Sequence, residues 1–265
     1  MKKGTAVCLA LGLFAASLAF SVPAGAAQES PLDQAKKEIK TFKLLSDADL
    51  YCSIFVLGDE RPAIKILAAE RGEEKVLLTD ADLCFINRGS ADGIALDQVF
   101  LVVEAGPDVV DRFGGANLGA IGHKRGRARV VAVDENQATV RLEKSCGQVM
   151  VGYYLMPFAA KEVVLGQDQG IEPAPAAGEG VDGRIIHLES TLEQIGSGHW
   201  AIVNLGTEDG LEAGRQVVAF RKLEGDAPRQ AIASLVVIDA GPKWSTVKVL
   251  SAKDVLQVGT EVQTR

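Results

Sequence analysis

The sequence has few of the residue types on which metal binding and acid–base catalysis depend. It contains three histidines, four cysteines and three methionines, and aromatic side chains make up 5% of its 265 residues. The histidines, His123, His187 and His199, are far apart in the sequence, and neither a Cys-x-x-Cys nor a His-x-x-x-His spacing occurs. A zinc site or a local catalytic motif would need such spacings. We therefore expect no metal, no cofactor and no enzymatic activity.

The chain also lacks an excess of positive charge. It has 28 lysines and arginines against 35 aspartates and glutamates, which gives a formal net charge of −7. An acidic protein is a poor candidate for nonspecific binding to nucleic acid or to anionic lipid, because both repel it. We expect no nucleic acid among its partners.

A long hydrophobic run occurs at the N-terminus, where Lys2 and Lys3 precede apolar residues 6–20. Small residues follow, with Ala24-Gly25-Ala26 as a cleavage box. This order is typical of a secretory signal peptide, and the run is short for a membrane span. We predict that residues 1–26 are removed and that the mature protein is exported, periplasmic or associated with the outer envelope, with no membrane span left after cleavage.

Helical periodicity follows the signal peptide. Ser30, Pro31 and Asp33 form a typical helix start, with a capping serine, a proline in the first turn and an early acid. Apolar residues then recur at helical spacing at Leu32, Ala35, Ile39 and Phe42. The pattern predicts an amphipathic helix over residues 30–46.

The pattern changes after Asp49 to short β-branched runs separated by glycine, aspartate and asparagine. Runs of this kind are typical of a small all-β barrel. Residues 166–180 are instead rich in proline and glycine, which is typical of an extended linker. We predict a β module over 47–158, a linker over 159–180 and a second module over 181–265. In the first module the strands are expected at 53–57, 75–78, 83–86, 99–103, 128–133 and 138–142.

The two modules repeat each other. Residues 87–93, NRGSADG, match residues 204–210, NLGTEDG, without a gap, and later segments match in the same order. Two copies of a β module predict an all-β fold of two tandem small antiparallel β barrels, of SH3-like size, with a short N-terminal helix.

The repeated segment has two interpretations, a ligand loop or a turn. A calcium loop of the EF-hand type needs oxygen ligands at positions one, three and five and glycine at six, whereas counting from Asn87 puts Gly93 seventh. Glycines that tolerate positive φ and polar side chains that bond nearby amides suit a turn. We therefore predict structural turns at Asn87, Gly89, Asp92, Gly93, Asn204, Gly206, Asp209 and Gly210.

Four segments carry a resemblance to a known family. They are FINRGSADGIALDQVFLVV, IVNLGTEDGLEAGRQVVAF, LLTDADLCFINRG and GRARVVAVDENQATVRLEKSCGQVMVGYYLMPF. They resemble the β module of bacterial envelope proteins in which it occurs beside LysM peptidoglycan-binding repeats, and a similar module forms the C-terminal domain of flagellar assembly protein T. The resemblance implies an exported, noncatalytic, all-β protein.

Three cysteines, Cys52, Cys84 and Cys146, remain after signal cleavage. An exported protein favours a disulfide, but three thiols allow three pairings and leave one over. Cys146 lies in a polar connection, whereas Cys84 lies in an apolar strand where a buried thiol packs well. The resemblance implies the pair Cys52–Cys146, because the related proteins tend to carry cysteines at both positions.

The main charged feature is HKRGRAR, residues 123–129. Strand alternation places Arg127 and Arg129 on one solvent face, near Lys124 or Arg125. Such a face discourages aggregation of an edge strand, or it contacts an anion such as a wall-polymer carboxylate, a lipid phosphate or an acidic protein patch. These four residues are the candidate binding residues.

These features together favour a noncatalytic protein that binds an envelope protein or a cell-wall polymer. We expect it to act as a scaffold or protein-binding part of a cell-wall, flagellar or secretion assembly. The alternative is a module that binds peptidoglycan or another glycan directly.

Overall fold

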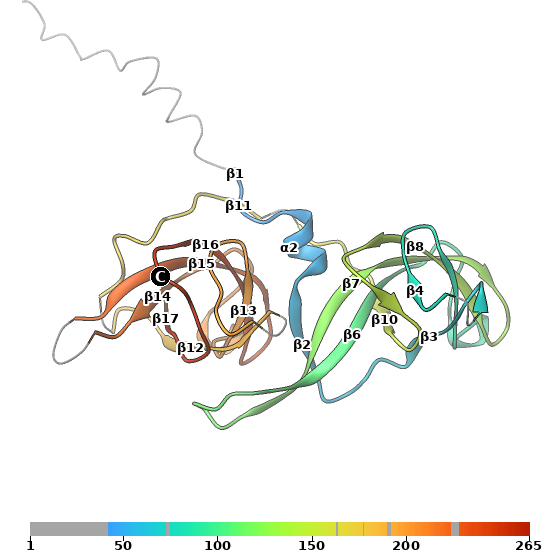
Figure 1. The fold of residues 1–265 in the computed structure, drawn as a ribbon, viewed down its shortest axis with the longest axis horizontal. Coiled ribbons are helices and arrows are strands. Elements are labelled where there is room, and N and C mark those ends of the chain that lie inside the picture. Colours follow the sequence, from blue (N-terminus) through green and yellow to red (C-terminus); the bar gives the residue numbers. More distant parts are fainter. Residues whose placement is uncertain (1–41, 73–74, 163, 177, 190–191, 224–227) are drawn as a thin grey trace, which may run out of the picture. The chain divides into compact units, whose positions relative to one another are not determined.

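The computed structural model describes residues 42–265 except 73–74, 163, 177, 190–191 and 224–227 (Figure 1). The predicted signal peptide therefore lies outside the described residues. All described residues belong to one compact unit. Within the described part of the chain, no helix has both the length and the hydropathy that crossing a membrane requires.

The first barrel is a closed ring of six strands in the order β7-β6-β10-β3-β5-β8, because β8 pairs with β7 as well as with β5. A further strand, β2 (Ile54–Gly58), pairs with the first part of β7 outside the ring. Apolar side chains that alternate along the strands, such as Phe100, Val130 and Val140, fill the interior. The ring strands are β3 (Ile64–Ala69), β5 (Leu83–Ile86), β6 (Val99–Val110), β7 (Asn117–Val133), β8 (Ala138–Ser145) and β10 (Tyr154–Pro157), and a separate pair is formed by β4 (Leu77–Leu78) and β9 (Val149–Met150).

The second barrel closes in the order β12-β13-β16-β15-β14-β17. Its interior is filled by side chains such as Ile185, Val217 and Leu235. Its strands are β12 (Asp182–Leu188), β13 (Trp200–Val203), β14 (Gln216–Arg221), β15 (Gln230–Ala240), β16 (Ser245–Ala252) and β17 (Glu261–Thr264).

The two rings have the same topology. In both rings the strands pair in the same order when they are numbered along the chain. The order is β3-β5-β8-β7-β6-β10 in the first ring and β12-β13-β16-β15-β14-β17 in the second. The register agrees too, since Phe85 faces Thr139 as Ile202 faces Thr246. The prediction of two tandem antiparallel barrels is confirmed.

The repeated segments form matching turns. In the first copy a 3₁₀ turn at Ser90–Asp92 ends at Gly93, whose φ of 82° is left-handed. Asp92 Oδ2 accepts a hydrogen bond from the Gly89 amide at 3.3 Å. The second copy has the turn Thr207–Asp209, Gly210 at φ 80° and a 2.9 Å bond from the Gly206 amide to Asp209 Oδ2. Glycine is needed at the last position because other residues rarely adopt this conformation.

The helix differs from the prediction. Residues 30–41 of the predicted helix lie outside the described residues, and its last part is not helical, because Phe42–Lys43 form β1, which pairs with β11 (Leu165–Gly166). The described α-helix, α2, spans Asp47–Cys52. Ser46 and Asp49 close its first turn reciprocally, with the Ser46 amide bonded to Asp49 Oδ2 at 2.7 Å and the Asp49 amide to Ser46 Oγ at 3.2 Å. This capping box makes Ser46 a helix start instead of a helix end.

Within the predicted linker, residues 159–180, the part at 168–171 is fixed to the second barrel. The Gln169 amide donates to Gln216 Oε1 at 3.0 Å, and Ser234 Oγ donates to Asp168 Oδ1 at 2.8 Å. Ile171 is buried against Val218 and its neighbours on the second barrel. Hydrogen bonds and a buried isoleucine thus anchor this proline- and glycine-rich segment.

Cys52 and Cys146 form a disulfide, with their Cα atoms 5.4 Å apart. The bond ties the end of α2 to the connection after β8. The pairing that the resemblance implied is confirmed. Cys84 is free and buried, and burial raises the pKa of its thiol to about 12.

The strands β6 and β7 are longer than predicted and form a hairpin that extends beyond the first barrel. With β2, its outer part Ala105–Gly122 makes a three-stranded projection, which we call the arm (Figure 1). The strands predicted at 99–103 and 128–133 left out Gly106 and Gly122 of this part. In the structure these glycines make room for packing, since a Cβ on Gly122 would lie 2.5 Å from the Phe55 ring and one on Gly106 would lie 2.5 Å from Ile121.

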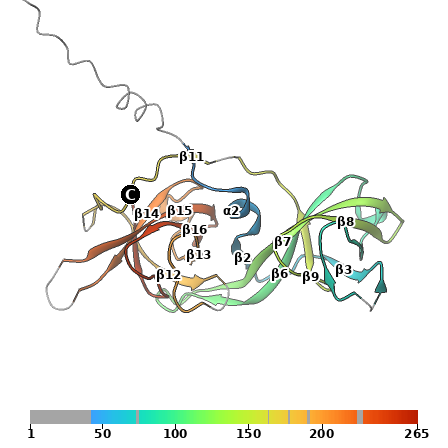
Figure 2. The same ribbon diagram turned by 45° about the horizontal axis from the view of Figure 1, so that its top comes forward.

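The arm and α2 pack on the second barrel. Figure 2 shows β2 and α2 beside β13 and β16. Ile54, Val109 and Ile121 of the arm share an apolar cluster with Ile186 and Ile202 of the second barrel. The barrels are therefore joined by a hydrophobic interface in addition to the connecting segment.

Candidate functional site

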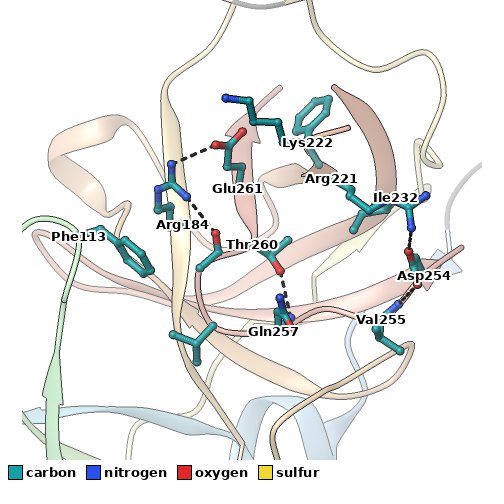
Figure 3. A pocket seen from close by; sticks show the side chains of 13 residues that line it. Phe113, Arg184, Arg221, Lys222, Ile232, Asp254, Val255, Gln257, Thr260 and Glu261 are labelled. Carbon is teal, nitrogen blue, oxygen red and sulfur yellow. Dashed lines mark hydrogen bonds and ion pairs between the residues drawn. The ribbon is translucent and has the colours of Figure 1, made fainter. Parts of the chain in front are cut away.

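A groove lies at one end of the second barrel, where the tip of the arm meets it (Figure 3). Two adjoining cavities of about 640 Å³ and about 410 Å³ share Phe113, Arg184 and Glu261. Phe113 comes from the arm, Arg184 from β12 and Glu261 from β17. The groove is thus built by both barrels.

Asp111 fixes the tip of the arm. Its Oδ1 accepts the Phe113 amide at 2.9 Å, and its Oδ2 accepts the side-chain amide of Asn204 at 3.0 Å. Burial alone would raise the pKa of the Asp111 carboxyl, but hydrogen bonds from Asn204, Gly114 and Phe113 outweigh it and hold the pKa below its ordinary value. The ionised carboxylate therefore links the arm to the second barrel and positions Phe113.

Arg184 forms the wall beside Phe113. Its Nη2 donates to Glu261 Oε1 at 3.0 Å, its Nη1 donates to the Gly259 carbonyl at 3.1 Å, and its guanidinium lies 5.1 Å from the centre of the Phe113 ring (Figure 3). A Cβ on Gly259 would lie 3.1 Å from that ring, so the glycine admits the ring closely. These contacts hold the guanidinium in place while its side chain stays partly exposed.

The opposite wall is formed by Arg221 and Asp254, which make an ion pair. Arg221 also donates to Gln230 Oε1 at 2.9 Å, and Asp254 Oδ1 accepts the Val255 amide at 2.9 Å. Three large apolar side chains of the lining are exposed, namely Phe113 at 50%, Val255 at 50% and Val258 at 43%. The groove therefore combines exposed apolar surface with charged groups of both signs.

This arrangement offers contacts for binding. Aromatic rings and arginines are enriched at protein-binding surfaces, and the exposed apolar side chains beside them add surface that binding would bury. The hydroxyl in the lining, that of Thr260, accepts the Gln257 amide at 3.0 Å. Among the described residues, no group of three or more histidines, cysteines or acids has a geometry that could hold a metal ion.

Lys124, the first candidate binding residue, is buried. Its ammonium group donates to the Leu50 carbonyl at 3.1 Å and to Ser53 Oγ at 3.0 Å, and it lies 3.6 Å from Asp239 Oδ2. Burial lowers the pKa of this amine to about 8. Lys124 therefore joins α2, β2 and the second barrel, and its charge does not face solvent.

The other three candidates also make contacts within the chain. Arg125 pairs with Glu104, Arg127 stacks on the rings of Tyr51 and Phe158 at 5.5 and 5.2 Å, and Arg129 pairs with Glu143. The strand that carries them is not an edge strand, because β7 pairs with β2, β6 and β8. The structure does not gather the four residues into one open basic face.

Sequence reasoning had identified Asn204 as a turn residue but had not identified Phe113, Arg184 or Glu261. The signal for Phe113 was an aromatic residue in the glycine-rich stretch DRFGGAN, which is typical of an exposed hairpin tip. Arg184 and Glu261 carry no local signal, because their pairing depends on barrel closure.

Models of known protein families and curated proteins were both compared with the chain, and neither comparison gives a match.

Proposed function

We propose that the protein is a noncatalytic exported protein of the cell envelope that binds other proteins as a scaffold. The resemblance of its β modules to those of LysM-associated proteins and of flagellar assembly protein T suggests a cell-wall, flagellar or secretion assembly. The disulfide Cys52–Cys146 supports an oxidising compartment, where such bonds persist.

The observation that carries the proposal is the exposed apolar surface of the groove. Phe113, Val255 and Val258 line the same groove as the ion pairs Arg184–Glu261 and Arg221–Asp254. An extended polypeptide suits this surface, because its apolar side chains would cover the valines while its carboxylates or amides would bond the partly exposed arginines.

Direct binding of peptidoglycan or another glycan is the second candidate. Sugars stack on exposed aromatic rings, and Phe113 is half exposed. Arg184 already lies over this ring, however, and the neighbouring large side chains Val255 and Val258 are aliphatic. The groove therefore favours protein over glycan.

Sedimentation with purified peptidoglycan and capture from detergent-extracted envelope proteins distinguish the two candidates. We expect the full chain to stay in solution with peptidoglycan alone and to capture discrete proteins from the extract. Val258→Asp should abolish capture, whereas Leu96→Asp, at an exposed position outside the groove, should not. Sedimentation with peptidoglycan alone, lost in Val258→Asp, would support the glycan candidate instead.

A further inference from the structure

The two barrels have equivalent outer faces, but these faces have different surroundings. In the second barrel, the outward side chains of β12, β13 and β16 contact the arm and α2. We call this the covered face; it consists of Ile186, Ile202, Thr246 and Lys248. Ile186 is 6% exposed, and Ile202 and Thr246 are fully buried at 0%.

Polar contacts add to this burial. Thr246 Oγ1 donates to the Ile54 carbonyl of β2 at 2.9 Å, and Lys248 pairs with Asp49 of α2 at 2.6 Å. The covered face thus binds a piece of polypeptide through two apolar side chains, a hydroxyl and a cation. The piece that it binds supplies apolar residues, a backbone carbonyl and a carboxylate. Trp200 of β13 adds a contact of its own, because its Nε1 donates to Asp49 Oδ1 at 3.0 Å, and Leu83 stands at its place in the first barrel.

The register identifies the equivalent residues in the first barrel. Phe85 opposite Thr139 corresponds to Ile202 opposite Thr246, and Leu83 opposite Arg141 corresponds to Trp200 opposite Lys248. Both barrels also have a β-bulge at the same place, between Ile66 and Ala68 in β3 and between Ile185 and His187 in β12. Leu67 is therefore the equivalent of Ile186. The open face consists of Leu67, Phe85, Thr139 and Arg141.

This face is exposed in the first barrel. Leu67 is 40% exposed, against 6% for Ile186. Phe85 and Thr139 are half-buried, and Arg141 is exposed. The open face thus keeps the chemistry of the covered face, with two large apolar side chains, a hydroxyl and a cation at matching positions.

A second basic position is common to the two barrels. Both Asn87 Oδ1 and Asn204 Oδ1 accept a backbone amide from the neighbouring strand, at 2.7 Å from Lys65 and at 2.6 Å from Arg184. Lys65 is thus the equivalent of Arg184, and it is exposed. In the second barrel Arg184 lies over Phe113 of the arm. The second barrel thus contacts α2 through Lys248 and the arm through Arg184. The first barrel has a cation at both equivalent positions, Arg141 and Lys65.

We propose that the open face binds a segment of a partner protein that resembles the arm and α2 in chemistry. The segment presents apolar side chains to Leu67 and Phe85, a carboxylate to Arg141 and an aromatic or acidic group to Lys65. Binding would bury the exposed surface of Leu67 as the arm buries Ile186.

A second copy of the chain does not fit this description. Two open faces placed against each other would bring Arg141 and Lys65 of one copy near the same cations of the other, and like charges at an interface repel. Among the described residues, the arm and α2 have the right chemistry, and both are already held on the second barrel by Asp49, Asp111 and the apolar cluster. The occupant is therefore a different protein.

The proposal rests on the proposed function, because it assumes that the protein binds other proteins, and it adds a second surface apart from the groove. The test is photo-crosslinking in cells that make the full chain. Benzoylphenylalanine is placed at Leu67 and, in separate proteins, at Val258 of the groove and at Leu96, which is exposed but outside both surfaces. The Leu67 protein is also made with Arg141→Glu and with Arg141→Gln, two changes at an exposed position.

We expect discrete protein adducts at Leu67 and none above background at Leu96. Arg141→Glu should reduce the Leu67 adducts at least about tenfold, since charge reversal at an interface costs more than 1.4 kcal/mol. Arg141→Gln should have a smaller effect. The crosslinked peptide should carry an acidic residue near apolar ones.

The proposal is overturned if no protein adducts form at Leu67, or if the adducts at Leu67 form equally well in Arg141→Glu. If Val258 still gives protein adducts in that case, the proposed function stands and the open face is not a binding surface. If neither Leu67 nor Val258 gives protein adducts, both the open-face proposal and the proposed function are wrong.

Discussion

Asp49 offers the sharpest test of how the two barrels are joined. Its carboxylate is buried in α2, where Oδ1 accepts Trp200 Nε1 at 3.0 Å and Oδ2 accepts Lys248 Nζ at 2.6 Å. The same Oδ2 accepts the amide and hydroxyl of Ser46, each at 2.7 Å. Both oxygens are thus acceptors. We predict that Asp49→Asn, which has nearly the same shape, destabilises the protein.

The magnitude follows from these contacts. The amide nitrogen of asparagine would face a donor whichever way it is turned, and Lys248, whose side chain is 20% exposed, would lose its counter-charge. Breaking a buried ion pair costs about 3–5 kcal/mol, and the partial exposure of Lys248 reduces this to about 2–4 kcal/mol. In a chain of this size the melting temperature should fall by roughly 4–16 °C.

Equilibrium denaturation of the full chain measures the effect, with Asp47→Asn as the matched control. Asp47 lies in the same helix and pairs with Lys43, but it is exposed, so its substitution should leave the denaturation midpoint unchanged. The loss in Asp49→Asn should be smaller when Lys248→Met is also present, because the cation is then gone while the donors of Ser46 and Trp200 remain.

The pH dependence gives a further check on Asp49. Burial would raise the pKa of its carboxyl, but hydrogen bonds from Lys248, Ser46 and Trp200 hold it below the ordinary value. A lowered pKa means that the ionised group stabilises the fold above about pH 4 and that this contribution is lost as the pH falls below it. A difference between wild type and Asp49→Asn under about 0.5 kcal/mol at pH 7 would refute this reasoning.

Three further predictions concern the remaining contacts. Replacing Cys52 and Cys146 by serine should lower the free energy of unfolding by about 3–5 kcal/mol, because the bond joins residues 94 positions apart; equal midpoints with and without the bond would contradict this. Since burial lowers the pKa of Lys124 to about 8 from 10.5, the folded protein loses this proton first and its stability should rise between those pH values. Lys124→Met should remove that rise, and an unchanged pH profile would rule out the assignment. Within one turn, Gly206→Ala should lower the free energy of unfolding more than Gly210→Ala. A Cβ at position 206 would lie 2.3 Å from a backbone oxygen, whereas at position 210 the only obstacle is the φ of 80°. Denaturation midpoints in the reverse order would contradict this.

The sequence was sufficient for the barrels because their strands repeat a simple pattern. The strand at Leu83–Ile86 was predicted with its observed bounds, since β-branched and apolar residues alternate inward between turn residues. The arm was missed because Gly106, Pro107 and Gly122 interrupt that pattern. In the structure, the side chain of Ile121 packs against the backbone at Gly106, and the ring of Phe55 packs against the backbone at Gly122. A local sequence pattern does not reveal such contacts.

The groove and the contacts of the basic residues depend on tertiary structure. Alternation placed Arg127 and Arg129 on one side of a strand, but the rings of Tyr51 and Phe158 that cover Arg127 come from α2 and the segment after β10. Similarly, Asn204 was recognisable as a turn residue, whereas its bond to Asp111 forms only because the arm reaches the second barrel.

Hydroxyl-radical footprinting of the full chain, alone and in an envelope fraction, tests whether one face is covered and its equivalent is open for a partner. In the purified protein, Leu67 at 40% exposure should react much faster than Ile186 at 6%. In the envelope fraction the labelling of Leu67 and Phe85 should fall while that of Ile186 and Ile202 stays low. Two results would contradict the proposal that the open face binds a partner: equal labelling of Leu67 and Ile186 in the purified protein, or labelling of Leu67 in the envelope fraction that is as strong as in the purified protein.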